Sequence, residues 1–206
     1  MLKIKQKNYS LRSNFFNNFG MFKFEEKILL QQVQRGQEAA FSRLYDSYQD
    51  KIYRFIYFRV SSESLAQDLT SETFMKVLQY LTSGKKIDSF QSFIYRTARN
   101  LVIDTYRQRG QEELPIDDFV RESIADQKDI AGDVADKFSL EQIEQGLGQL
   151  SGHYRDAIVL RFVEDLPFKD VGEVLGINEE HARVLVHRGL KMLKNTLQIK
   201  DFNESS

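Results

Sequence analysis

Residues 153–194 decide the fold of this chain, and they read HYRDAIVLRFVEDLPFKDVGEVLGINEEHARVLVHRGLKMLK. Four apolar residues in the middle fall at helical spacing and predict a short helix with one buried side: Phe168, Val171, Val174 and Leu175. Gly176 can adopt the left-handed backbone that ends this helix. Asn178 can cap the helix that follows. The pattern predicts a helix, a short helix, a three-residue turn and a long helix.

The long helix after Asn178 has two distinct sides. Its buried stripe is expected to hold Ala182, Val186, Gly189, Leu190 and Leu193. Its exposed side is expected to present Arg183, Val184, His187, Arg188 and Lys191. Two helices joined by a tight turn, the second with a basic outer face, are typical of a helix-turn-helix that enters the major groove of DNA. The sequence therefore predicts DNA binding.

Composition narrows the class of protein. The chain has 206 residues, a net charge of −1 and no cysteine, which excludes disulfides and thiolate metal sites. No apolar run reaches the roughly 18–20 residues needed to cross a bilayer, and the N-terminus lacks the apolar segment of a secretory signal. A cytoplasmic location is expected.

The net charge conceals an uneven distribution. Residues 110–136 carry two basic and nine acidic side chains, whereas residues 24–109 carry 13 basic and 10 acidic ones. An acidic connector thus offsets basic surfaces elsewhere in the chain. We expect residues 110–137 to be a flexible acidic linker with a short helical turn near 131–137, either as a solvated tether or as a mimic of nucleic acid. Residues 1–24 are expected to be a disordered basic tail. Two alternatives are open for its origin: Met21 is the true start, or the residues before it are an ordinary N-terminal extension.

Residues 25–109 show the pattern of a helix bundle. The first periodic segment holds Phe41, Leu44, Tyr45, Tyr48, Ile52, Phe55 and Ile56 at core spacing. A second helix is expected from about residue 63 to 81, with Leu69, Thr73, Val77 and Leu81 inside. A third is expected from about 89 to 107. It should bury Phe90, Phe93, Ile94, Thr97, Ala98 and Leu101 and expose Arg96, Arg99, Asn100, Ile103 and Arg107. The fold class is therefore all-α, with two small helical domains, 25–109 and 138–200, on an acidic linker.

Several segments together resemble the extracytoplasmic-function group of the bacterial sigma-70 family. In the first domain they are AAFSRLYDSYQDKIYRFIYFRV, SLAQDLTSETFMKVLQYL and FQSFIYRTARNLVIDTYRQR. In the second domain the segment is LSGHYRDAIVLRFVEDLPFKDVGEVLGINEEHARVLVHRGLKMLK. The resemblance implies sigma region 2 at 25–109, which docks on polymerase and recognises and melts the −10 element. It implies sigma region 4 at 138–200, which recognises the −35 element.

The resemblance also implies roles for individual residues. The polymerase-binding positions are Leu65, Gln67, Asp68, Leu69, Glu72 and Phe74. The DNA-binding positions of the first domain are Lys85, Lys86, Asp88, Arg96, Arg99, Asn100 and Arg107. Those of the second domain are His181, Arg183, Val184, His187, Arg188 and Lys191. The expected partners are core RNA polymerase, promoter DNA and an anti-sigma factor, with the chain itself a monomer.

Some positions depart from the usual family pattern. Ser151 stands where proline is usual, Gly172 where alanine is usual, and His181-Ala182 where Thr-Val is typical. Val184 and Leu185 replace polar or basic residues. An apolar Val184 on the reading side can pack on a thymine methyl group, or it can simply mark a reduced −35 contact. Leu185 is expected to lie beside the buried stripe.

Other functional classes find little support. The three histidines lack the close spacing of a metal site, and no nucleophile–base pair or phosphate-binding loop is visible, so we expect no enzyme activity, metal or cofactor. Two alternatives remain open. One is a free-standing helix-turn-helix regulator, and the other is an adaptor that binds polymerase without reading DNA.

Overall fold

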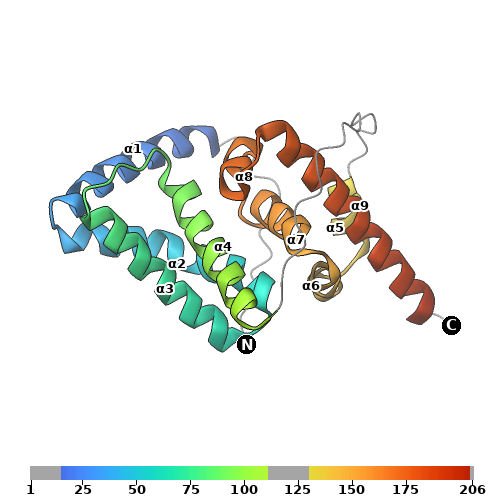
Figure 1. Ribbon diagram of the computed structural model, residues 1–206. Helices are drawn as coiled ribbons and strands as arrows, with labels where there is room; N and C mark the ends of the chain where they lie inside the picture. Colours follow the sequence, from blue (N-terminus) through green and yellow to red (C-terminus); the bar gives the residue numbers. More distant parts are fainter. Residues whose placement is uncertain (1–14, 111–129, 205–206) are drawn as a thin grey trace. The chain divides into compact units, whose positions relative to one another are not determined.

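The computed structural model describes residues 15–110 and 130–204, and every regular element in those ranges is a helix (Figure 1). By internal contacts the chain divides into two compact units, described separately below. The first comprises Met1–Ser47 with Leu78–Lys86, and the second Tyr48–Val77 with Ile87–Ser206. Helices α2 and α3 contribute residues to both units.

The first domain consists of four helices among the described residues, and the last two begin and end within one residue of their predicted bounds. The four helices are α1 (Phe15–Gln34), α2 (Glu38–Val60), α3 (Glu63–Thr82) and α4 (Phe90–Gln108). The second part of the chain holds α5 (Ile130–Lys137), α6 (Leu140–Gln149), α7 (Gly152–Ile158), the π-helix η1 (Val159–Val163), α8 (Phe168–Leu175) and α9 (Glu179–Glu204). Helix α5 matches the short helical turn predicted near 131–137. Residues 111–129 of the predicted linker lie outside the described residues.

Helix α1 extends further toward the N-terminus than the sequence pattern indicates. It begins at Phe15, so residues 15–24, expected as part of a disordered tail, are helical here. Once a helix is nucleated, each added residue gains one hydrogen bond for one residue fixed, so extending a helix is easier than starting one. Residues 1–14 lie outside the described residues.

The core of the first unit is small and aliphatic. Its buried apolar side chains are Leu29, Val33, Ala40, Leu44 and Leu81. Tyr45, which the spacing placed in the core, is 36% exposed, so this part of the prediction was wrong. Tyr45 follows the stripe residue Leu44 directly, about 100° further around the helix. It therefore sits at the edge of the buried stripe.

The second unit contains the aromatic core of the first domain. Phe55 of α2 packs edge-to-face on Tyr95 of α4, with 5.5 Å between ring centroids. Tyr48 packs on Phe90 in the same way at 5.2 Å. Edge-to-face contacts of this kind stabilise a core beyond the effect of area alone. They hold the axis of α4 against α2 and so fix which side of α4 faces solvent.

The start of α4 is set by a side-chain cap. Ser89 precedes the helix with extended backbone, and its Oγ accepts a hydrogen bond from the Ser92 amide at 3.2 Å. Ile94, Ala98 and Leu101 are buried as predicted. Phe93 and Thr97, predicted to be buried, are partly exposed.

The second domain is built around α9, which packs against α5, α6, α7 and α8. The predicted stripe of Ala182, Val186, Gly189, Leu190 and Leu193 is buried, and so is Leu185 beside it. Gly189 permits close packing, because a Cβ there would come within 3.0 Å of the Ile158 Cδ1 atom. The capping box of Ser139 and Gln142 fixes the start of α6.

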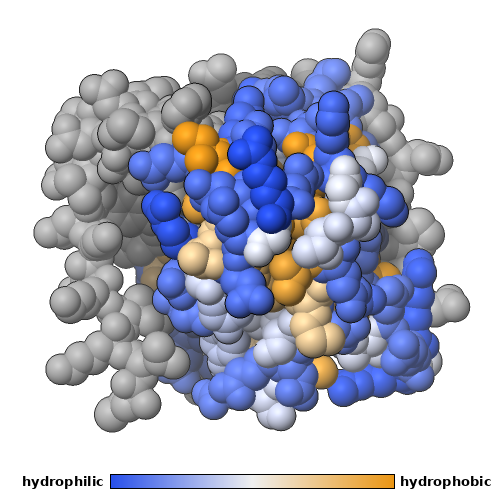
Figure 2. Space-filling view, turned by 90° about the vertical axis from the view of Figure 1, so that its left-hand side faces the viewer, coloured by the Kyte–Doolittle hydropathy of each residue, from blue (hydrophilic) through white to orange (hydrophobic). Residues whose placement is uncertain are grey.

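The surfaces of these helices are largely polar. Figure 2 shows one face of the molecule as mainly hydrophilic, with small, separate hydrophobic areas. This is expected where amphipathic helices turn their apolar sides inward. Among the described helices none is long and apolar enough to cross a membrane.

Candidate nucleic-acid interface

The turn of the helix-turn-helix has the predicted geometry. Gly176 ends α8 with φ 74° and ψ 29°, the left-handed conformation that glycine adopts without strain. Asn178 then accepts a hydrogen bond at Oδ1 from the backbone N–H of His181 at 2.8 Å. The side chain thereby satisfies one of the free amides at the start of α9. Both local predictions for this turn are confirmed.

Gly172 in α8 has a steric reason to lack a side chain. A Cβ at this position would lie 2.7 Å from the carbonyl oxygen of Ile177 in the turn. The Ile177 amide also donates to the Gly172 carbonyl at 2.9 Å, which holds the turn close against the helix. A side chain at position 172 would therefore collide with the backbone of the turn.

Arg183 is an exposed cation on α9, the second helix of the helix-turn-helix, and two neighbouring side chains contact it. Its guanidinium carbon lies 4.5 Å from the centroid of the Phe168 ring, and its Nη2 atom bonds Oε1 of Glu179 one turn earlier. Arg161 approaches the same ring at 5.2 Å. The side chain of Arg183 is half exposed. Phe168 and Arg161 were not among the predicted site residues. The feature of the sequence that could have indicated this contact is the aromatic residue Phe168 at the start of α8.

The other predicted DNA-binding residues of α9 differ in their accessibility to solvent. Lys191 is exposed, and His181, His187 and Arg188 are partly exposed. Val184, predicted at the centre of the exposed side, is only 5% exposed, so that prediction was wrong. A helical wheel assigns one buried side, but α9 has neighbours in α5 as well as in α6, α7 and α8. In this conformation Val184 is not available to pack on a base.

Three predicted DNA contacts form a stripe on α4. Arg96, Asn100 and Arg107 are all exposed. Their spacing of four and then seven residues places them on one side of the helix. A stripe of two guanidinium groups and an amide can contact phosphates and base edges.

Arg99 was predicted on the same exposed side, and this was wrong. Its side chain is buried and donates from Nε to Oδ2 of Asp156 in α7 at 2.9 Å. Its Nη2 atom lies 3.0 Å from Nδ1 of His153. Arg99 sits about 60° around the helix from Arg96, at the edge of the stripe. There the second domain provides a carboxylate, which the sequence pattern of α4 alone could not reveal.

The loop before α4 presents its charges to solvent. Lys85, Lys86 and Asp88 are exposed, and Gly84 turns the chain with φ 75°. The backbone carbonyl of Lys85 accepts a hydrogen bond from the Gln34 side chain at 3.0 Å. The Lys85 ammonium lies 5.3 Å from the centroid of the Tyr80 ring. The backbone of the loop is thus anchored at Lys85, while its charges remain accessible.

The predicted polymerase-binding positions on α3 fall into two groups. Gln67 and Asp68 are exposed, and Leu65 and Glu72 are partly exposed, with Glu72 3.4 Å from Lys76. Leu69 and Phe74 are only 5% and 3% exposed, which confirms the predicted inner position of Leu69 and places Phe74 in the core as well. Their role in polymerase binding stays a prediction. The sequence pattern missed Met75, which is 60% exposed three residues after Glu72.

Glu164 is a second buried carboxylate that the sequence analysis did not single out. Arg54 of α2 donates to both of its oxygens, at 3.2 and 3.1 Å, and the Tyr95 hydroxyl donates to Oε2 at 2.8 Å. Burial raises the pKa of Glu164 despite these partners. Burial and the nearby carboxylate raise the pKa of Tyr95 well above its ordinary value. Tyr95 therefore acts as a hydrogen-bond donor.

These features define a two-domain helical DNA-binding protein with no group of three potential metal ligands among the described residues. The Sigma-70 region 2 model matches residues 44–112, and the Sigma-70 region 4 model matches residues 146–195. This chain belongs to the sigma-70 family of bacterial RNA polymerase sigma factors, within the extracytoplasmic-function group.

Two characterised relatives illustrate the similarity. The chain is 30% identical to the extracytoplasmic-function sigma factor BldN of Streptomyces coelicolor over 82% of its own length and 64% of that protein. It is 28% identical to SigW of Bacillus subtilis over 82% of its own length and 95% of that protein. The chain thus spans slightly less than two thirds of BldN but nearly all of SigW.

Solved structures share the fold. CnrH, solved in complex with the cytosolic domain of CnrY, matches 85% of this chain and 98% of its own with a TM-score of 0.65 and 20% identity. The sigma factor RpoE of Bartonella quintana, solved with the anti-sigma factor NepR, matches 77% of this chain and 97% of its own with a TM-score of 0.58 and 19% identity.

Proposed function

We propose that this chain directs core RNA polymerase to a promoter and assists in opening the duplex there. The observation that supports the proposal is the presence, in one chain, of two surfaces that are suited to contact DNA. One is the stripe of Arg96, Asn100 and Arg107 on α4 in the region 2 domain, and the other is the helix-turn-helix of the region 4 domain.

The α4 stripe and the loop before it would meet the −10 element. Phosphate contacts by Arg96 and Arg107 would release counterions, while Asn100 can bond a base edge. Capture of an unstacked base costs a few kcal/mol, which contacts within a pocket can offset. The chain would therefore open DNA by binding the separated strand, without catalysing a reaction.

The N-terminal half of α9 would enter the major groove of the −35 element. Arg183 is held by Phe168 and Glu179, so less rotamer entropy is lost when it contacts DNA. Arg188 is partly exposed and Lys191 is exposed. We assign Arg188 to a base contact and Lys191 to a phosphate.

Polymerase docking is assigned to the exposed side of α3. Asp68, Glu72 and Met75 are spaced by four and three residues and so share one side of the helix. A mixed acidic and apolar surface fits a basic partner with a central hydrophobic contact. Leu69 and Phe74 would support this surface from below.

Run-off transcription with purified core polymerase and genomic DNA fragments tests the proposal. The expected result is promoter-specific transcripts that require the chain. A free-standing regulator would bind duplex DNA as a dimer and give no transcripts with core polymerase. An adaptor would bind core polymerase but give no promoter-specific transcripts. We further propose that the chain is a cytoplasmic monomer. We also propose that an anti-sigma factor controls it, because RpoE, which shares the fold, was solved in complex with the anti-sigma factor NepR.

A further inference from the structure

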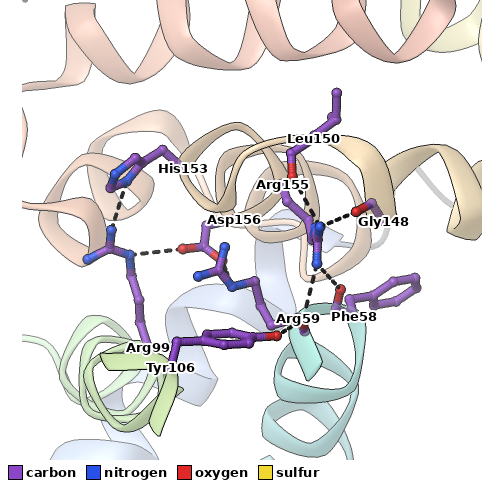
Figure 3. Close-up of polar contacts among 9 residues, drawn as sticks. All are labelled: Phe58, Arg59, Arg99, Tyr106, Gly148, Leu150, His153, Arg155 and Asp156. Atoms are coloured by element: carbon purple, nitrogen blue, oxygen red, sulfur yellow. Dashed lines mark hydrogen bonds and ion pairs between the residues drawn. The ribbon is translucent and has the colours of Figure 1, made fainter. Parts of the chain in front are cut away.

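The exposed cations that region 2 can offer to a DNA strand include two lysines in the loop before α4. Arg99 is buried and bonded to Asp156 and His153 (Figure 3), so its guanidinium is not accessible. Lys85 and Lys86 are exposed in the short loop 85–88 between α3 and α4. An exposed loop has few buried contacts to hold it in place. The contacts that do hold this loop therefore decide where its ammonium groups lie.

The end of α3, from which the loop departs, is closed by local contacts. Gly84 has φ 75°, and its amide donates to the Leu81 carbonyl at 3.2 Å. The Ser83 hydroxyl donates to the Tyr80 carbonyl at 2.7 Å. A left-handed residue after a helix is a common way to satisfy the last carbonyls. The Lys85 ammonium also lies 5.3 Å from the centroid of the Tyr80 ring, and this cation–π contact restrains its side chain.

A residue far away in the sequence holds the backbone of the loop. Nε2 of Gln34 donates to the Lys85 carbonyl at 3.0 Å, although the two residues are 51 positions apart in the chain. This hydrogen bond connects the end of α1 to the residue that begins the loop. Since it uses the backbone of Lys85, the ammonium group of that residue stays exposed to solvent.

The backbone that carries Gln34 is itself well fixed. Gln34 is the last residue of α1. Gly36 follows with φ 82°, and the Gln37 amide donates to the Gln32 carbonyl at 3.0 Å. This is the closed cap in which a left-handed glycine brings the chain back onto the last turn of a helix. The amide group of Gln34 is thus presented from a rigid helix end.

We propose that Gln34 is a positioning residue for the loop 85–88, and that it places the Lys85 ammonium where the separated strand of the −10 element binds. This inference rests on the proposed function and adds to it a residue of α1. A loop that is already held in place loses less conformational entropy when a strand binds to it. Gln34 therefore strengthens strand binding without contacting DNA.

Gln34→Met tests the proposal in the full chain. Methionine has about the length and helix propensity of glutamine, but its thioether cannot donate a hydrogen bond. Amide hydrogen exchange of the loop, followed by mass spectrometry, should become about threefold to tenfold faster, the equivalent of one net hydrogen bond. Binding of a labelled oligothymidine, a probe for single-stranded DNA, should weaken by a similar factor.

A double-mutant cycle separates positioning of the ammonium group from a general structural effect. Lys85→Ala removes the ammonium but keeps the backbone carbonyl that Gln34 bonds. Gln34→Met should therefore reduce oligothymidine affinity much less in the Lys85→Ala background than in the wild-type chain. A residue with a purely structural role would cause the same loss of affinity in both backgrounds.

Gln31→Met is the matched control. It makes the same substitution at another exposed position of α1, three residues earlier. Loop exchange and oligothymidine binding should both stay at the wild-type level. Thermal melts of the two variants should match that of the wild-type chain, because both side chains are exposed.

Loop exchange at the wild-type rate in Gln34→Met would overturn the proposal. An equal loss of oligothymidine affinity with and without the Lys85 ammonium would also overturn it. Failure of the proposed function would look different, since the wild-type chain would then give no promoter-specific transcripts with core polymerase. Hydrogen exchange and oligothymidine binding are measured on the chain alone, so they decide the role of Gln34 in either case.

Discussion

The guanidinium of Arg183 lies 4.5 Å from the ring centroid of Phe168, so the first helix of the helix-turn-helix positions a cation on the second. The side chain is half exposed and also bonds Glu179. An exposed cation–π contact is worth about 0.5–1 kcal/mol. The side chain is thereby held near one conformation before any DNA is bound.

This relationship gives a prediction for −35 binding. Arg183→Ala should weaken binding to a cognate duplex by about 1–3 kcal/mol if it reads a base. Phe168→Leu should weaken it by a smaller amount, about 0.5–1 kcal/mol, because the cation remains but is no longer positioned. Fluorescence anisotropy with promoter duplexes measures both. Phe162→Leu is the control, since Phe162 is 43% exposed and contacts Arg161 but not Arg183.

Charge reversal on α3 tests polymerase docking. Replacing Asp68 and Glu72 by lysine should weaken binding to core polymerase in a pull-down, because the acidic side would then repel a basic partner. Loss of the exposed Glu72–Lys76 pair should cost little stability. Asp46 and Asp50 form a matched control, being two exposed acids at the same spacing on α2. Full retention of the Asp68/Glu72 variant would refute the assignment.

The α4 stripe makes a prediction about duplex opening. Alanine at Arg96 and Asn100 should reduce open-complex formation more than polymerase binding, because these side chains would contact the separated strand. Permanganate reactivity of promoter thymines measures the opening, and a pre-melted template should partly restore transcription. Asp104→Ala, another exposed substitution on α4, serves as control. Thymine reactivity equal to wild type would mean that this side of α4 has another role.

Gly172 and Gly148 make a paired prediction for stability. Gly172→Ala should destabilise the second domain by about 1–3 kcal/mol, because its Cβ would press on the Ile177 carbonyl at 2.7 Å. Gly148→Ala should stabilise it by up to about 1 kcal/mol, because Gly148 lies in α6 with no atom within 4 Å of the added Cβ. Thermal melts followed by circular dichroism distinguish the two. An unchanged melting temperature for Gly172→Ala would show that the turn can move.

Glu164 predicts a pH dependence of stability. Burial raises its pKa in the folded chain, although Arg54, Tyr95 and Lys51 act to lower it. In the unfolded chain the carboxyl is solvated and has its ordinary pKa. The folded form therefore binds the proton more tightly. The contribution of Glu164 to stability is complete below the ordinary carboxyl pKa and is lost as the pH rises through the raised one.

The melting temperature should accordingly fall with rising pH across that window. Glu164→Gln is permanently neutral, so it should remove this step. Glu173→Gln, which changes an exposed carboxyl on α8, should leave the wild-type pH profile unchanged. A wild-type profile that matches that of Glu164→Gln would contradict the role of Glu164.

Local patterns in the sequence determined the helices and the turn between α8 and α9. The apolar spacing predicted α3 and α4 within a residue or two, and Gly176 and Asn178 marked the turn, because these signals depend only on neighbours along the chain. The family was also identified from the sequence, because the segments that resemble region 2 and region 4 occur in the expected order along the chain with a linker between them.

Only the tertiary structure decided which charged and apolar side chains are accessible. Arg99 and Val184 both lie on sides that a helical wheel calls exposed, yet both are buried. Arg99 meets Asp156, which is 57 residues away in the chain, and α9 has packing neighbours on several sides. A periodic pattern records that a helix has one apolar side. It carries no information about which distant element will cover the other side, because that depends on long-range packing and on the pairing of buried charges.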